Sequence, residues 1–170
     1  MSTFFQDLPT LQPDEPDLVA PLEKLIHGVP FARGKARQSQ DLFGKWGRCA
    51  FGKGLIDGDD SIPTLWAGIT ADRVGQERGD GAYLSVWINA EKKHPLNSSI
   101  VLLHKQLHRR NEAWERADSY WLVSRSISLV EFLRTDREQG AFVQEFVKGA
   151  LADLEAVGIG NVVDKMTIGK

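Results

Sequence analysis

The sequence predicts an α+β fold: a single domain with a mainly antiparallel sheet of about four strands, two long amphipathic helices on one face and a short N-terminal helix. Two observations predict it. Three strand-like segments follow one another along the chain, and a helix, a further strand and a second helix come after them. Both long helices also carry wide apolar stripes, which need a sheet face to cover. The chain has 170 residues, 42% of them hydrophobic, and shows no internal repeat. One domain with one core therefore follows.

The first elements are an irregular arm over residues 1–17 and a short helix that opens the single domain over residues 18–170. The arm contains three of the seven prolines and four acids, together with Phe4 and Phe5. The helix has apolar residues on one face, and Gly28 and Pro30 end it. These apolar residues are Leu18, Leu22, Leu25 and Ile26.

Four segments are predicted to form strands, because apolar and polar residues alternate along them. They cover residues 46–56, 62–70, 83–89 and 120–129. Residues 31–44 show no convincing period, so no element is predicted there. Residues 72–81 are polar and glycine-rich, which is typical of a long hairpin loop.

Two long helices follow from the spacing of apolar residues. The first is predicted to begin with Asn97 or Ser98 as its N-cap and to end near Trp114, which shares its apolar stripe. Thr135 and Glu138 form a capping box for the second, which Gly158 ends. The tail from residue 159 to 170 is expected to add a short strand.

Composition excludes several classes of protein. Twenty-one Lys and Arg against 23 Asp and Glu give a net charge of −2, which excludes a globally basic nucleic-acid binder. No segment approaches the roughly eighteen apolar residues of a membrane span, so no membrane partner is expected. A single cysteine, Cys49, excludes an internal disulfide and a thiolate metal cluster. The N-terminus lacks the pattern of a secretory signal, so a cytoplasmic location is predicted.

One face of the predicted sheet is unusual. Alternation places Trp66 with Thr64 and Thr70, and places Trp87 with Tyr83, Ser85 and Asn89, all on the side opposite the apolar residues. Two explanations stay open. Either the N-terminal helix or the Phe4–Phe5 arm covers the rings, or Trp66, Tyr83 and Trp87 form a stacking platform or a partner groove.

A basic segment adjoins this region. Between residues 31 and 53, six bases stand against one acid, which gives a local charge of +5. Such a segment suits a polyanion or an acidic protein surface, and the alternative is a solvated loop. No RNA-binding signature accompanies it, so nucleic acid is only a possible partner through residues 33–53. The bases are Arg33, Lys35, Arg37, Lys45, Arg48 and Lys53.

Glu91 and Lys93 form an E-x-K pattern at the end of a predicted strand. Magnesium-dependent nucleases of the PD-(D/E)xK type place an aspartate beside such a glutamate, with the lysine near the attacking water. Asp60, at the start of the preceding strand, is the aspartate that would meet Glu91 across an antiparallel pair. Asp72 and Asp80 would lie at the opposite end of the hairpin.

Other polar residues support no motif. His104 and His108 lie four apart on a helix without the HExxH pattern, and are predicted to be rim residues. Cys49 is predicted to be a small buried hydrophobe. Arg125 shares the parity of apolar neighbours, so it either pairs with a carboxylate or points into an anion site.

The function predicted first is a non-enzymatic macromolecule-binding protein of inhibitor, immunity or adaptor type, with no cofactor and with another protein as its partner. The predicted contact residues belong to the aromatic face and the adjacent basic segment; they are Trp66, Tyr83, Trp87, Arg33, Lys35, Arg37, Lys45 and Arg48. One alternative is the magnesium-dependent nuclease that uses Asp60, Glu91 and Lys93. Another is a small-molecule-binding sensor with a pocket lined by Trp66 and Trp87.

Overall fold

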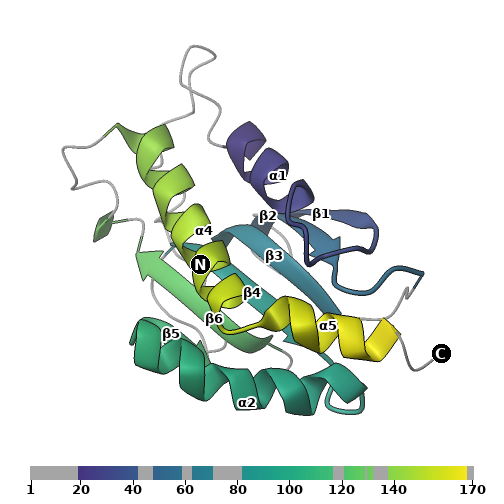
Figure 1. The fold of residues 1–170 in the computed structure, drawn as a ribbon. Coiled ribbons are helices and arrows are strands. Elements are labelled where there is room, and N and C mark those ends of the chain that lie inside the picture. The colour runs from purple at the N-terminus through teal and green to yellow at the C-terminus, as the bar shows by residue number, and fades with distance from the viewer. Residues whose placement is uncertain are drawn as a thin grey trace.

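The computed structural model describes residues 19–41, 48–58, 63–70, 82–116, 121–128, 130–131 and 138–167. They form a single α+β domain with a six-stranded antiparallel sheet of order β1-β2-β3-β4-β6-β5 (Figure 1). The fold class predicted from the sequence is confirmed, with a larger sheet than expected. The arm over residues 1–17, the loop over residues 72–81 and Thr135 lie outside the described residues.

The sheet contains three strands close to the predicted ones, a shortened β2 and two additional strands. The strands are β1 (Ala36–Asp41), β2 (Arg48–Gly54), β3 (Pro63–Thr70), β4 (Tyr83–Ala90), β5 (Trp114–Arg116) and β6 (Trp121–Ser128). Among the described residues, the helices of nine residues or more are α1 (Val19–His27), α2 (Pro95–Arg110), α4 (Gln139–Ala156) and α5 (Ile159–Thr167).

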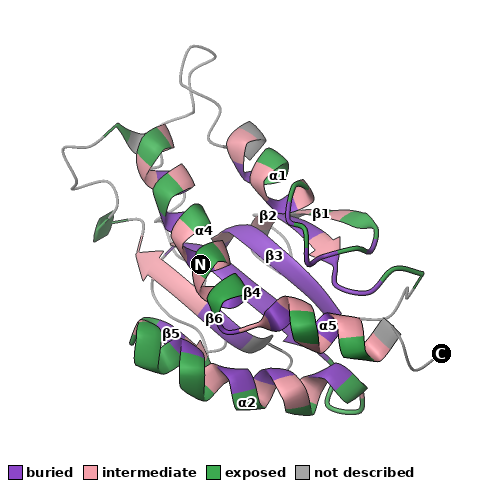
Figure 2. Cartoon of the chain, viewed as in Figure 1, coloured by how far each residue is buried: buried purple, intermediate pink, exposed green. Residues whose placement is uncertain are grey.

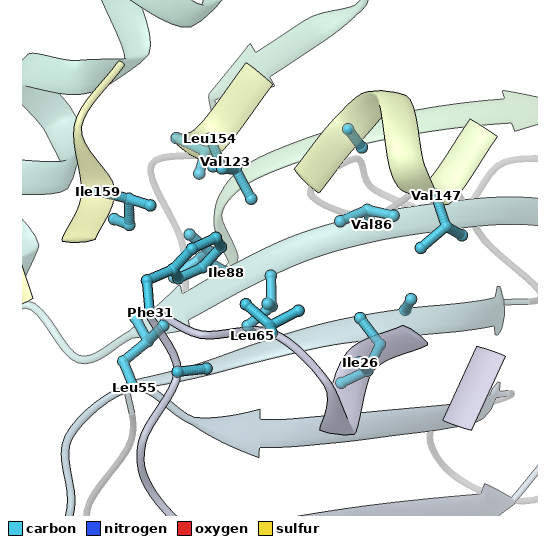
Figure 3. Packing of buried hydrophobic residues seen from close by; sticks show 14 of the residues in the cluster. Ile26, Phe31, Leu55, Leu65, Val86, Ile88, Val123, Val147, Leu154 and Ile159 are labelled. Carbon is cyan, nitrogen blue, oxygen red and sulfur yellow. The ribbon is translucent and has the colours of Figure 1, made fainter. Parts of the chain in front are cut away.

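All four helices pack on one face of the sheet. Helix α1 contacts β2, β3 and α4, helix α2 contacts β5, β6 and α5, and helix α4 contacts β4. The core lies between these layers, where Ile26 of α1 and Val147 of α4 belong to the same cluster as Leu65 and Ile88 of the central strands (Figure 3). Strands β3 and β4 are buried along almost their whole length (Figure 2).

The sequence misses the two edge strands. The β1 sequence, ARQSQD, has no apolar alternation, yet it pairs with β2 along all six of its residues. Backbone hydrogen bonds hold such an edge strand without an apolar side-chain pattern. Trp114 was expected on a helix, but α2 ends at Arg110, and Asn111 caps it by donating its backbone N–H to Leu107. Trp114 instead begins β5.

The helix starts also differ from the prediction. His94, not Asn97 or Ser98, is the N-cap of α2, and its Nδ1 accepts from Leu96 N at 3.1 Å. Pro95 takes the first helical position, where its missing N–H is harmless. Glu138 is itself the N-cap of α4, because its carboxylate accepts from Gly140 N and Ala141 N. The tail forms helix α5 instead of a strand.

Candidate binding face of the sheet

Trp66 and Trp87 lie on the same face of the sheet, as alternation predicts. Trp66 of β3 is directly opposite Trp87 of β4 and Gly52 of β2, and Trp87 is opposite Ser124 of β6. We call the side that faces away from the helices the Trp face. Its described residues on the three central strands are Thr64, Trp66, Gly68, Thr70, Tyr83, Ser85, Trp87, Asn89, Ser124, Ser126 and Ser128.

The two indoles are held in one fixed arrangement. Their ring centroids are 6.1 Å apart and their planes differ by 13°, so the rings stack. Trp66 Nε1 donates to Asn89 Oδ1 at 3.2 Å. A Cβ on Gly52 would lie 2.6 Å from the Trp66 ring, so the ring occupies the space above that glycine. Glycine is therefore required at position 52 because the indole of Trp66 approaches the β2 backbone closely.

The first helix does not cover these rings. Leu22 and Ile26 of α1 belong to the core on the opposite face, whereas Trp66 and Trp87 form a separate cluster with Ala50. None of the described helices contributes a residue to that cluster. The explanation in which the N-terminal helix covers the indoles is therefore wrong. The Phe4–Phe5 arm lies outside the described residues.

The indoles are nevertheless closed to solvent. Trp66 is 7% exposed and Trp87 0% exposed, whereas Tyr83, Ser126 and Ser128 are half-buried. Stacking on a nucleic-acid base needs an open ring face. In this arrangement, the residues of the Trp face that remain accessible to a partner lie around the indoles.

The Trp face is also the polar side of the buried sheet. It contains every buried polar residue of the described chain: Thr64, Thr70, Ser85, Asn89 and Ser124. Ser85 Oγ and Ser126 Oγ are hydrogen-bonded at 2.8 Å. Thr64 is 0% exposed, and its hydroxyl has no hydrogen-bond partner among the described residues. A buried hydroxyl group is unfavourable unless it is hydrogen-bonded. The Trp face, with its buried polar residues, therefore differs chemically from the apolar core under the helices.

The basic segment does not form one continuous patch in the described residues. Arg33 makes an ion pair with Asp164 of α5. Lys53 Nζ donates to the backbone oxygens of His27 at 2.8 Å and Val29 at 3.4 Å, at the C-terminal end of α1. Two of the six bases therefore hold elements of the fold together.

The remaining bases are distributed differently. Arg37 is opposite Gly52, which places it on the Trp face, and Lys35 is exposed. Arg48 lies in β2, where the structure describes its backbone but not its side chain. Lys45 lies outside the described residues. Arg37 is thus the base that the described residues place beside the indoles.

The strand pairing that the nuclease alternative requires is present, but Asp60, the aspartate of that alternative, lies outside the described residues. Pro63 at the start of β3 pairs with Ala90 at the end of β4, so residues preceding β3 and following β4 leave the same end of the sheet. Glu91 and Lys93 are exposed in the turn that leads to α2. Asp60 lies outside the described residues, so the alternative has no contact to support it.

Arg125 pairs with a carboxylate on the helix-covered face. Its Nη1 lies 3.3 Å from Asp153 Oδ2 of α4, and its guanidinium lies 5.1 Å from the centre of the Phe146 ring. Burial lowers the pKa of the Arg125 guanidinium, and the Asp153 carboxylate acts in the opposite direction. Of the two alternatives left open by the sequence, the carboxylate partner is the one found.

A cavity of about 280 Å³ lies away from the Trp face, where the segment after α1 meets the α4–α5 junction. Its lining includes Phe31, Arg33, Glu155, Asn161 and Asp164. The sensor alternative expected a pocket at Trp66 and Trp87. There the two rings stack on each other, and one of them fills the space above Gly52.

Comparisons with protein-family models, with curated proteins and with solved structures gave no match. Among the described residues, no helix is long and apolar enough to cross a membrane. The functional argument therefore rests on the side chains and the geometry of this chain.

Proposed function

We propose that this protein is a non-enzymatic macromolecule-binding protein that docks another protein over the Trp face. The observation that carries the proposal is the concentration of every described buried polar residue on this one face, around two stacked indoles. A second hydrophobic core would favour aliphatic residues at these positions. Tryptophan and tyrosine are enriched at the centre of protein interfaces, where charged residues are depleted.

The indoles act in this proposal as a rigid floor. Their stacking and the Trp66–Asn89 hydrogen bond fix the ring positions before a partner arrives. A surface that is already ordered loses little conformational entropy on binding. The direct contacts come from the half-buried residues around the floor, which are Tyr83, Ser126, Ser128 and Arg37.

The charges favour a protein over a nucleic acid as the partner. Lys53 and Arg33 make contacts within the fold, and Arg37 is a described side chain that the strand register places on the Trp face. Nucleic-acid binding depends on several phosphate contacts from Lys and Arg, and on open aromatic faces for stacking. The described side chains of the Trp face include one such base, Arg37, and two closed rings.

Site-specific photo-crosslinking in the native host tests the proposal. A photoreactive residue replaces Tyr83 or Ser128 on the Trp face, or Lys105 on α2 as a matched control, because Lys105 is exposed on the helix side. We expect positions 83 and 128 to give the same protein adduct, and position 105 to give none. An adduct formed only at position 105 would contradict the proposal.

A second arm separates binding from folding. Tyr83→Arg places a long charged side chain on the Trp face without altering either indole, and Lys105→Glu is the control. We expect Tyr83→Arg to weaken complex formation at least about tenfold, as loss of an aromatic interface anchor does. Its melting temperature should stay close to that of the parent chain. A complex of unchanged affinity with Tyr83→Arg would exclude docking over this face.

A further inference from the structure

Two histidine rings of α2 converge on a single backbone oxygen of β5. His104 Nε2 lies 3.3 Å and His108 Nδ1 lies 3.0 Å from the carbonyl oxygen of Trp114. The ring centroids are 5.8 Å apart. His108 is exposed and His104 half-buried, so the site lies at the surface.

We propose that His104 Nε2, His108 Nδ1 and the Trp114 carbonyl oxygen form a binding site for one divalent transition-metal ion. Neighbouring ligands about 2.1 Å from one metal ion are separated by roughly 3.0 Å in octahedral geometry and 3.4 Å in tetrahedral geometry. The two nitrogen–oxygen distances, 3.0 and 3.3 Å, lie within that interval. Each of the two nitrogens therefore already lies at ligand spacing from the shared carbonyl oxygen.

Metal binding determines where the proton of each ring lies. Only a neutral imidazole binds a metal ion, because the lone pair must be free. On metal binding, each ring transfers its proton from the coordinating nitrogen to its other nitrogen, so each imidazole stays neutral.

The donor set selects the kind of metal ion. Two imidazole nitrogens suit Cu²⁺, Ni²⁺ and Zn²⁺, whereas Mg²⁺ and Ca²⁺ prefer sites made of oxygen. The described residues contain no group of three or more His, Cys, Asp or Glu side chains that could hold a metal ion. The backbone carbonyl supplies the third protein ligand here, and water completes the coordination.

Calorimetric titration of the full chain with Ni²⁺ tests the site, with Mg²⁺ as the comparison ion. We expect one Ni²⁺ per chain and no binding of Mg²⁺. His104→Gln and His108→Gln should each weaken Ni²⁺ binding about tenfold or more. Glutamine keeps an N–H donor for the Trp114 oxygen, so these variants retain the packing of β5 against α2.

Two variants control for histidines elsewhere. His27→Gln changes a histidine of α1, and His94→Asn keeps an oxygen acceptor at the N-cap of α2. Both should bind Ni²⁺ like the parent chain. With Cu²⁺, the electron paramagnetic resonance spectrum should show coupling to two imidazole nitrogens, and to one in His108→Gln. Absence of Ni²⁺ binding, or equal loss in the control variants, would overturn the proposal.

Discussion

Asp153 Oδ2 of α4 accepts a hydrogen bond from Trp114 Nε1 at 3.0 Å and joins the second long helix to the short edge strand β5. The same oxygen lies 3.3 Å from Arg125 Nη1 of β6, and Asp153 Oδ1 lies 3.5 Å from Arg110 Nε of α2. One carboxylate therefore connects four elements on the helix-covered face.

Asp153→Ala should lower the free energy of unfolding by about 3 kcal/mol. Removing one partner of a largely buried ion pair leaves the other charge uncompensated, and Arg125 is only 19% exposed. Arg110→Gln should lower it by less than about 1 kcal/mol, because the Arg110 side chain is 51% exposed. Urea denaturation measures both values. Equal losses for the two variants would contradict the central role of the Asp153–Arg125 pair.

Gly52→Ala should destabilise the protein by roughly 1–3 kcal/mol, because its Cβ would lie 2.6 Å from the Trp66 ring. The same substitution at Gly149 within α4 meets Arg125 Nη1 at an ordinary 3.5 Å. There, alanine should raise stability by up to about 1 kcal/mol through its higher helix propensity. Thermal denaturation of the two variants should give shifts of opposite sign.

Lys53→Met should lower the free energy of unfolding by about 1–2 kcal/mol, because the ammonium donates to two backbone oxygens at the end of α1. Methionine retains most of the apolar length of the side chain. Lys92→Met, in the exposed turn after β4, is the control and should change stability little. Hydrogen exchange should show that the amides of α1 lose protection first.

Acid should destabilise the fold partly through His104. Its pKa in the folded protein is lowered, mainly by burial, from the ordinary value of 6.5. As pH falls through 6.5, the unfolded chain takes up the proton first, so stability decreases until the folded-state pKa is passed. Between about pH 7.5 and about pH 5.5, the melting temperature of the parent chain should fall more than that of His104→Gln. Equal falls would show that another group dominates.

Alternation along the central strands was sufficient to predict β3, β4 and β6 to within one residue. These strands place apolar residues against the helices, so the period is visible in the sequence. β1 carries no such pattern, because backbone pairing with β2 holds it. The start of α2 was misplaced, because a histidine N-cap before Pro95 is weaker as a sequence signal than Asn97 or Ser98.

The sequence predicted that Trp66 and Trp87 share a face, and the strand register confirms it. It did not determine which face of the sheet α1 covers, since alternation within a strand says nothing about the position of α1. Asp153 was missed because its partners Trp114 and Arg125 are 39 and 28 residues away. The one sign of this contact in the sequence was Arg125 itself, a charged residue among apolar residues on the same side of its strand.

The described helices all pack against the same side of the sheet. In β3 and β4, the residues that face the helices and the residues that face away from them are therefore under separate packing constraints. Substitutions at Leu65 or Ile88 act on the helical layer, whereas exchanges among the serines and threonines of the reverse side leave that layer untouched. Homologous chains can therefore vary at these serine and threonine positions while keeping the same architecture.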